Sequence, residues 1–313
     1  MVGFNPAQTT PLSATQYAIA GAVSGAITRA VCQPLDVLKI RFQLQIDPIV
    51  KSDVSKYWGI RHAANSIWHE EGWRAFWKGH VPAQGLSVAY GISQYASFEV
   101  FTRLVWEHMP EHLTREYRPL THLVCGSLAG CTSTLAVQPM DVLRTRFVAQ
   151  GEPKIYRSLG DACVSIWRQE GVVGFYRGLI PAMTQIGPQM GLQFGLYSLC
   201  TSIWDVTKSE DSVLPAAIPS LVCGSGSGLL AKLIIYPLDV IKKRLQVQGF
   251  EKARESFGTF HQYKGFTDCL VKLLAAEGAR GLYKGLGPSL IKAAVVAGCN
   301  FCVYDQVVYT MSR

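Results

Sequence analysis

One ten-residue pattern occurs three times in this 313-residue chain and limits the fold more than any other feature. PLDVLKIRFQ begins at Pro34, PMDVLRTRFV at Pro139 and PLDVIKKRLQ at Pro237, so the copies are 105 and 98 residues apart. Each copy follows a long apolar run and has an acid two residues after the proline and a base five residues after it. This period predicts three equivalent units of about 100 residues.

A second block follows each proline. EGWRAFWKG covers 71–79, EGVVGFYRG covers 170–178 and EGARGLYKG covers 277–285. Each copy reads EG, four residues, an aromatic residue, a base and a glycine. A pair of glycines four residues apart also precedes each proline, and such pairs predict close packing between helices. The pairs are Gly21 and Gly25, Gly126 and Gly130, and Gly224 and Gly228.

Composition places the repeats in a membrane. Charged residues make up 17% of the chain and hydrophobic residues 49%, whereas a soluble domain has about 25% charged residues. We therefore predict an all-α membrane protein with six transmembrane helices in three pseudo-threefold repeats, each with a short amphipathic helix. A soluble helical-repeat protein is the alternative, but its units usually have about 34 to 47 residues.

The predicted spans all exceed the ~20 residues that cross a bilayer. They cover 16–44, 80–108, 119–149, 179–206, 216–247 and 285–311, with short helices at 59–70, 157–169 and 264–276. The repeats are expected at 16–108, 119–206 and 216–311, after a tail at 1–15. That tail has neither a signal-peptide core nor the arginines of a transit peptide, so any organelle address is expected to be internal.

Loop charge predicts the topology. The long loops inside the repeats, 45–78, 151–177 and 249–284, carry 15 of the 30 Lys and Arg residues. The loops between repeats carry three, Arg115, Arg118 and Lys208. Because basic loops tend to stay on the inner side, the long loops are expected on one face and both termini on the other.

The charges after each proline need a polar environment. A proline kinks a membrane helix, and a charge at its centre costs at least ~2.5–3.5 kcal/mol, so these side chains are expected to face an interior. Around a threefold axis the three acids would meet three bases from neighbouring repeats. The acids are Asp36, Asp141 and Asp239, and the bases are Lys39, Arg144 and Lys242. A solvated rim is the alternative, but it would not require the same offsets three times.

These blocks resemble the signature of the mitochondrial carrier family, P-x-[DE]-x-x-[KR]-x-[KR] followed by EG-x4-aromatic-[KR]-G, over essentially the whole chain. The resemblance implies a monomeric six-helix barrel in the mitochondrial inner membrane, with both termini in the intermembrane space, that exchanges solutes by alternating access. It implies a matrix gate made of the pairs Asp36–Arg144, Asp141–Lys242 and Asp239–Lys39. Gln43 and Gln246 would brace two pairs, and Val148 stands at the third brace position.

The resemblance also implies sites for lipid, in particular cardiolipin. Backbone N–H groups at helix N-termini bind phosphate readily. The expected site residues are Trp77, Lys78 and Gly79, Tyr176, Arg177 and Gly178, and Tyr283, Lys284 and Gly285, together with Gly59 and Gly265. Ser158 replaces the corresponding glycine in the second repeat. Aromatic anchoring at the membrane interface is the simpler alternative.

Positions where the repeats differ predict the substrate site. Arg29, Thr134 and Lys232 lie seven residues before the three aspartates, and Leu86, Gln185 and Lys292 lie seven residues after the block glycines. Three cations with no acid at equivalent positions imply an anionic solute with one or more phosphates. The amides of Gln94, Gln189 and Asn300 would suit its organic part, although they serve helix–helix hydrogen bonding equally well.

Stretches that extend beyond the signature, such as FWKGHVPAQ and LVCGSGSG, resemble family members that carry thiamine pyrophosphate. The implied solute is thiamine pyrophosphate, exchanged against nucleotides, but the three cations suit a nucleotide equally well. A carrier for another phosphorylated solute, or a leak pore, stays open. The sequence contains neither an HExxH nor a GxSxG motif, so no motif indicates an enzyme, a metal site or a cofactor. The basic residues form no stripe that would bind nucleic acid.

The opposite gate looks weaker. The resemblance implies an aromatic residue, an acid and then a base three residues later on each even-numbered span. Here Phe98-Glu99 is followed by Thr102, with Arg103 as a local partner, and Tyr304-Asp305 is followed by Val308. Tyr197 is followed by Ser198. We therefore expect the substrate-free protein to rest open to the intermembrane space.

Overall fold

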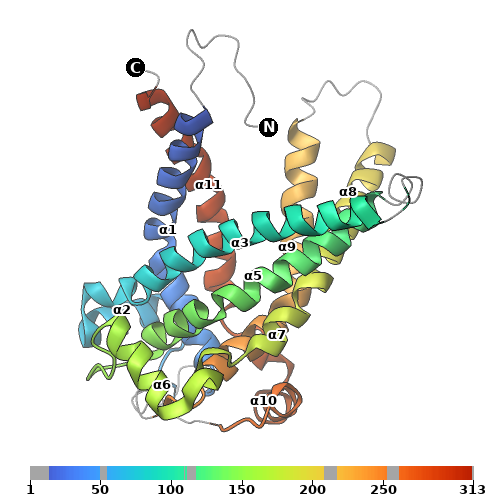
Figure 1. The fold of residues 1–313 in the computed structure, drawn as a ribbon. Helices are drawn as coiled ribbons and strands as arrows, with labels where there is room; N and C mark the ends of the chain where they lie inside the picture. Colours follow the sequence, from blue (N-terminus) through green and yellow to red (C-terminus); the bar gives the residue numbers. More distant parts are fainter. Residues whose placement is uncertain are drawn as a thin grey trace.

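The structure is a computed structural model that describes residues 14–49, 55–108, 110, 118–207, 217–251 and 261–311. Within these ranges the regular elements are helices, and their order repeats three times along the chain (Figure 1). The first repeat contains α1 (Ala14–Leu44), α2 (Ile60–Glu71), the 3-10 helix η1 (Trp73–Trp77) and α3 (His80–His108). The second contains α5 (Arg118–Ala149), α6 (Leu159–Phe175), α7 (Leu179–Thr184) and α8 (Ile186–Thr207). The third contains α9 (Ala217–Gln246), α10 (Phe266–Gly281) and α11 (Leu286–Met311).

The long helices match the predicted spans within two residues at each end, with one difference. The span expected at 179–206 is divided into α7 and α8 at Gln185. Pro188 lies three residues later and has no N–H to donate to the carbonyl of Thr184, so the helix loses one backbone hydrogen bond at this point. The break therefore falls on a predicted substrate-site residue.

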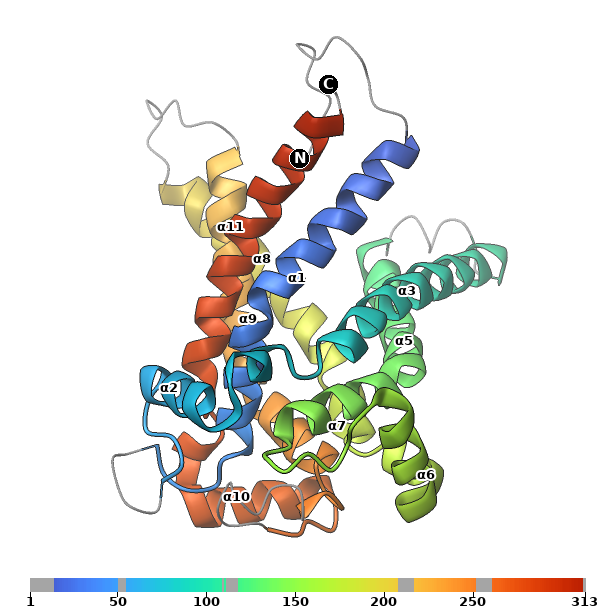
Figure 2. The same cartoon turned by 90° about the vertical axis from the view of Figure 1, so that its left-hand side faces the viewer.

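The long helices form three pairs, and each pair joins two repeats. Helix α3 packs along α5, α8 along α9 and α11 along α1, which closes the three repeats into a ring (Figures 1 and 2). Helices α2, α6 and α10 gather at one end, which we call the short-helix end. The first turn of α1 and the last turn of α11 lie at the other end.

The outer surface of the long helices is apolar. Val81 and Ile92 on α3 and Ile180 on α7 are each more than 60% exposed. Exposed apolar side chains of this size and number are typical of a lipid-facing surface and argue against a soluble helical-repeat protein. Among the described residues, two helices are long and apolar enough by composition alone to cross a membrane, Leu120–Ala149 and Val222–Gln246.

Only some of the paired glycines are packed closely against a neighbouring helix, although their repetition predicted close packing in all three repeats. Gly130 lies against Ile186, whose Cγ2 would be 2.8 Å from an added Cβ, and Gly126 and Gly224 approach aromatic rings. Gly21, Gly25 and Gly228 have no atom within 4 Å of an added Cβ. The expectation of close packing in all three copies is therefore wrong for the first pair and for half of the third, where an added Cβ would meet open space.

The glycines that end the EG blocks hold the short-helix end together. Gly79, Gly178 and Gly285 have φ values of 75°, 75° and 82°, a conformation that side chains disfavour. A Cβ on them would lie 2.9 Å from the Arg144 carbonyl oxygen, 2.9 Å from that of Lys242 and 2.7 Å from that of Lys39, respectively. Each glycine thus lets the start of one helix touch the end of the next repeat's first helix.

We predict that Gly178→Ala destabilises the protein, since positive φ alone costs a side chain about 1–2 kcal/mol and the clash adds to it. The measurement is the thermal unfolding temperature of the purified protein in detergent. Gly191→Ala is the matched control, because its added Cβ meets nothing within 4 Å. Equal unfolding temperatures for the two variants would contradict the close approach.

Candidate functional site

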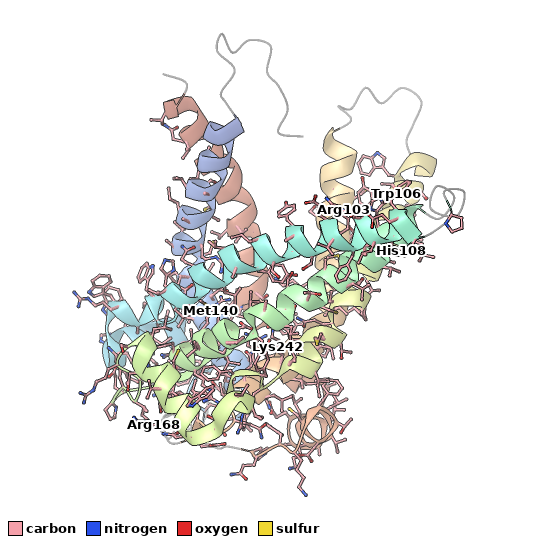
Figure 3. The ribbon with its side chains drawn as sticks, viewed as in Figure 1. Arg103, Trp106, His108, Met140, Arg168 and Lys242 are labelled. Atoms are coloured by element: carbon pink, nitrogen blue, oxygen red, sulfur yellow. The ribbon has the colours of Figure 1, made fainter. Side chains whose placement is uncertain are left out.

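Three ion pairs connect the proline-containing helices α1, α5 and α9 at the short-helix end. Every pair joins two different repeats, so together they form a closed ring, which we call the ion-pair ring. The pairs are Asp36–Arg144 at 2.7 Å, Asp141–Lys242 at 2.8 Å and Asp239–Lys39 at 2.6 Å. These are the contacts that the sequence led us to expect, and all six side chains are at most a quarter exposed. Figure 3 shows Lys242 among the helices, whereas Arg103 and His108 lie near the far end of α3.

Two of the three aspartates also receive a glutamine amide. Gln43 Nε2 donates to Asp239 Oδ2 at 3.1 Å, and Gln246 Nε2 donates to Asp141 Oδ2 at 2.8 Å. Val148 occupies the third position and has no donor to offer. The second carboxylate oxygen of Asp36 instead accepts from Lys292 Nζ at 2.6 Å. Lys292, predicted as a substrate ligand, is therefore also part of the ring.

Lys243 was missed by the sequence reasoning. Its ammonium group donates to Asp141 Oδ1, Thr145 Oγ1 and Gln246 Oε1, each at 3.0 Å. The equivalent positions in the other repeats hold Ile40 and Thr145. The double lysine in DVIKKR was the available signal, but the family pattern assigns a role only to the first of the two.

A second layer of ion pairs lies below the ring and was also missed. The second base of each signature forms a two-pronged contact with the glutamate of the EG block in its own repeat. The pairs are Arg41–Glu71, Arg146–Glu170 and Arg244–Glu277. The Nε of the same arginines donates to backbone carbonyls in the next repeat, those of Val148 at 3.3 Å, Gln246 at 3.1 Å and Gln43 at 3.1 Å. Each arginine therefore ties a short helix to the ring.

Glu71 illustrates the electrostatics of this layer. Burial alone would raise the pKa of its carboxyl group, but hydrogen bonds from Arg41 and Lys78 outweigh burial and hold the pKa below its usual value. Its stabilising contribution is therefore present at neutral pH, and it is lost only as the pH falls through that lowered pKa.

The bases proposed for lipid binding are engaged within the protein. Lys78 Nζ lies 2.6 Å from Glu71, and Lys284 Nζ lies 2.5 Å from Glu277 and 2.6 Å from the carbonyl oxygen of Ile46. Arg177 Nε lies 2.7 Å from Glu170, but its side chain is 30% exposed. The groups left for a phosphate are thus mainly backbone N–H groups and Arg177.

The residue before each proline provides a further tether. Gln33 Nε2 donates to the Lys78 carbonyl at 3.0 Å, and Gln138 Nε2 donates to the Arg177 carbonyl at 2.8 Å. In the third repeat the Tyr236 hydroxyl donates to the carbonyl of Lys284 at 3.1 Å. Each repeat thus fixes the start of its second long helix to its first at the level of the ring.

A cavity of about 330 Å³ lies directly on the ion-pair ring. Of the predicted substrate residues it is lined by Thr134, Gln185 and Lys292, with Leu86 and Gln189. Its charged lining comprises three acids, Asp36, Asp141 and Asp239, and five bases, Lys39, Arg144, Lys242, Lys243 and Lys292. The lining therefore has two more positive than negative charges.

The other predicted substrate residues lie elsewhere. Arg29 donates to the carbonyl of Ala83 at 2.8 Å, and Lys232 lies 3.4 Å from that of Ser289, so both contact the second long helix of their own repeat. Gln94 lines a larger apolar pocket of about 740 Å³ between α3, α5 and α8. Met190 lines both this pocket and the charged cavity. Asn300 lies in α11, but its side chain is outside the described residues.

At the far end, Glu99 pairs with Arg103 at 3.3 Å on the same helix, and both side chains are more than two-thirds exposed. Such an exposed pair one helical turn apart contributes about 0.3–0.5 kcal/mol at most. The side chains of Tyr304, Asp305 and Val308 lie outside the described residues.

Comparison with known proteins agrees with the threefold architecture. The family described as "Mitochondrial carrier protein" matches residues 10–109, 115–206 and 215–313. The chain belongs to the mitochondrial carrier family. The all-helical fold with three repeats is thereby confirmed, and six spans are the architecture of this family.

Individual carriers are similar over nearly their whole length. The chain is 48% identical over 308 residues to the "Mitochondrial thiamine pyrophosphate carrier" of Bos taurus, covering 97% of this chain and 96% of the relative. It is 49% identical over 302 residues to the carrier of the same name in Homo sapiens, covering 95% and 93%. A "Mitochondrial thiamine diphosphate carrier 1" of Zea mays is 38% identical over 314 residues, covering 92% of each chain.

The ring geometry predicts which charge swap in this carrier will restore function. Removing one partner of a buried pair costs about 3–5 kcal/mol, so Lys39→Asp and Asp239→Lys should each impair transport. The combined swap should recover most of it, because Gln43 contacts this site and its Oε1 can accept from an ammonium group as readily as its Nε2 donates to a carboxylate. Uptake into proteoliposomes is the measurement.

The matched comparison is the swap of Asp141 with Lys242. Lys243 stays 3.0 Å from the position of the swapped acid, so a lysine placed there would meet a like charge and recover less transport. Equal recovery by the two swaps would contradict the assigned contacts of Lys243.

Proposed function

We propose that this carrier moves thiamine pyrophosphate across the mitochondrial inner membrane in exchange for nucleotides, by alternating access. Similarity over nearly the full chain to carriers named for thiamine pyrophosphate supports the solute. The observation that carries the proposal is the cavity on the ion-pair ring, lined by five bases and three acids. In a low-dielectric setting, surplus positive charge attracts a polyanion such as a pyrophosphate ester.

The neighbouring apolar pocket suits the organic part of such a solute. Its lining includes Tyr95, Phe98 and Phe194, and Gln94 provides an amide for ring heteroatoms. Met190 lines both spaces, so the pocket adjoins the charged cavity. We propose that the pyrophosphate lies on the ring and that the aromatic rings lie against these side chains, where stacking and cation–π contacts are favourable.

Loop charge supports one orientation of the protein in the membrane. The basic loops belong to the short-helix end, so we propose that this end faces the matrix and that both termini lie in the intermembrane space. The described ion pairs close the ring within one chain, which supports a monomer as the transporting unit. Alternating access then requires the ring to open while the other end closes.

We also propose that lipid phosphate, in particular that of cardiolipin, binds the N-termini of the short helices. Helix α2 begins after Gly59 with no side-chain cap, so its first N–H groups suit a phosphate. At α6, Ser158 and Asp161 hydrogen bond to backbone N–H groups, and at α10 Asp268 accepts from Lys264 N. These carboxylates disfavour an anion, so the site at Gly59 should bind lipid more tightly than that at Gly265.

A competition panel in proteoliposomes tests the solute. Uptake of labelled thiamine pyrophosphate should be inhibited by unlabelled thiamine pyrophosphate and by nucleotides, and not by thiamine, which lacks the phosphates. Stronger inhibition by a nucleotide or coenzyme A than by thiamine pyrophosphate would assign the carrier to another phosphorylated solute. Uptake that proceeds without internal solute would indicate a uniporter or a leak in place of an exchanger.

We predict that Lys292→Ala lowers thiamine pyrophosphate uptake by at least tenfold, since a hydrogen bond to a charged group is worth about 1.5–3 kcal/mol. Gln189→Ala is the matched control, because it removes an uncharged side chain from the same cavity lining and should have a smaller effect. Uptake is compared per molecule of correctly inserted protein. A normal rate for Lys292→Ala would remove Lys292 from the binding site.

A further inference from the structure

The three aspartates of the ring differ in where their second hydrogen-bond donor comes from. Asp239 and Asp141 receive it from Gln43 and Gln246, which lie one turn beyond the ring bases on α1 and α9. Asp36 receives it from Lys292 on α11, at 2.6 Å. Lys292 also lines the charged cavity. Asp36 therefore takes its second donor from a side chain of the cavity lining, whereas Gln43 and Gln246 do not line that cavity.

Position 148 is spatially equivalent to the two glutamine brace positions, but its valine side chain has no hydrogen-bond donor. The Cγ atoms of Gln43 and Gln246 lie 3.0 and 3.1 Å from a Cβ placed on Gly285 and Gly178, respectively. Val148 Cγ2 lies 3.1 Å from a Cβ placed on Gly79, so the three side chains start in equivalent positions. The side chain of a glutamine at position 148 would therefore extend towards Asp36. It would do so as the side chains of Gln43 and Gln246 extend towards Asp239 and Asp141.

We infer that Lys292 replaces the missing glutamine brace, and that a phosphate of the solute releases the Asp36–Arg144 pair by drawing Lys292 away from Asp36. Lys292 carries a single positive charge, for which the Asp36 carboxylate and the phosphate of the solute compete. When the phosphate takes it, Asp36 keeps Arg144 alone, whereas the other two aspartates keep their amides. The ring then opens first between α1 and α5.

The release of this pair by solute rests on the proposed function, but the replacement of the brace does not. It can be tested on the solute-free protein through its thermal unfolding temperature in detergent. Lys292→Ala leaves Asp36 with one donor and should lower the unfolding temperature by a few degrees, at about 2–4 °C per kcal/mol for a chain of this size. Val148→Gln supplies an amide donor to Asp36. The double variant with Lys292→Ala and Val148→Gln should therefore recover most of the lost unfolding temperature.

Two control variants distinguish the effect of the added hydrogen-bond donor from other effects of the substitutions on the unfolding temperature. Val148→Met adds a side chain of similar length without a donor, so it should not rescue Lys292→Ala. Lys232→Ala removes a cation of α9 that contacts the Ser289 carbonyl, and its effect should simply add to that of Val148→Gln. Strict additivity of Lys292→Ala and Val148→Gln, or rescue by Val148→Met, would overturn the brace replacement.

The release step predicts that Val148→Gln alone has opposite effects on binding and transport. With the introduced amide on Asp36, freeing Lys292 costs less, so thiamine pyrophosphate should bind more tightly, on the order of tenfold for one charge-assisted hydrogen bond. The same amide keeps the ring closed, so the maximal exchange rate should fall. Binding is measured by calorimetry on the purified carrier and exchange in proteoliposomes.

The outcomes are distinguishable. Tighter binding with slower exchange supports the release step, whereas unchanged or weaker binding overturns it. If the protein binds no thiamine pyrophosphate at all, the proposed solute and the release step fail together. The unfolding experiment is unaffected by that result, because it contains no solute.

Discussion

The ion-pair ring imposes one requirement on the rest of the structure: every charge that it brings out of water must be satisfied. Stranding one member of such a pair costs about 3–5 kcal/mol, whereas a satisfied pair contributes little net stability. Each aspartate accordingly has at least two donors, and the first helices of the three repeats must meet closely enough to supply them. The block glycines allow that approach, and the arginine–glutamate layer below fixes the short helices to the same place.

The ring also explains the cavity. Its charges close one end of the space between the helices and at the same time form the surface on which a solute would rest. Lys243 and Lys292 add two positive charges to an otherwise balanced set of three acids and three bases. Closure of this end and the proposed anion binding therefore use the same side chains. A solute that interacts with this surface necessarily competes with the contacts that keep the end closed, which is the coupling that alternating access requires.

The sequence predicted the helices and the ring contacts well because both depend on repeated features. Apolar length set the spans, and the fixed offsets of acid and base from Pro34, Pro139 and Pro237 indicated the partners. What could not be predicted depends on places where one repeat differs from the others. Lys243 and the contact of Lys292 with Asp36 occur once each, so no repetition pointed to them. The engagement of Lys78 and Lys284 by glutamates depends on chain reversals that neither periodicity nor charge specifies.

The two ends of the molecule differ: we propose that the ring holds the matrix end closed, and no comparably buried set of pairs is present among the described residues at the other end. Labelling at position 86 tests it most directly, because Leu86 lines the cavity above the ring. In a variant with Leu86→Cys and the nine native cysteines replaced, a membrane-impermeant maleimide is added to mitoplasts and to inverted inner-membrane vesicles without solute. A ring that closes the matrix end predicts rapid labelling in mitoplasts, whose intermembrane-space face is exposed, and protection in inverted vesicles. Labelling in inverted vesicles alone would contradict it.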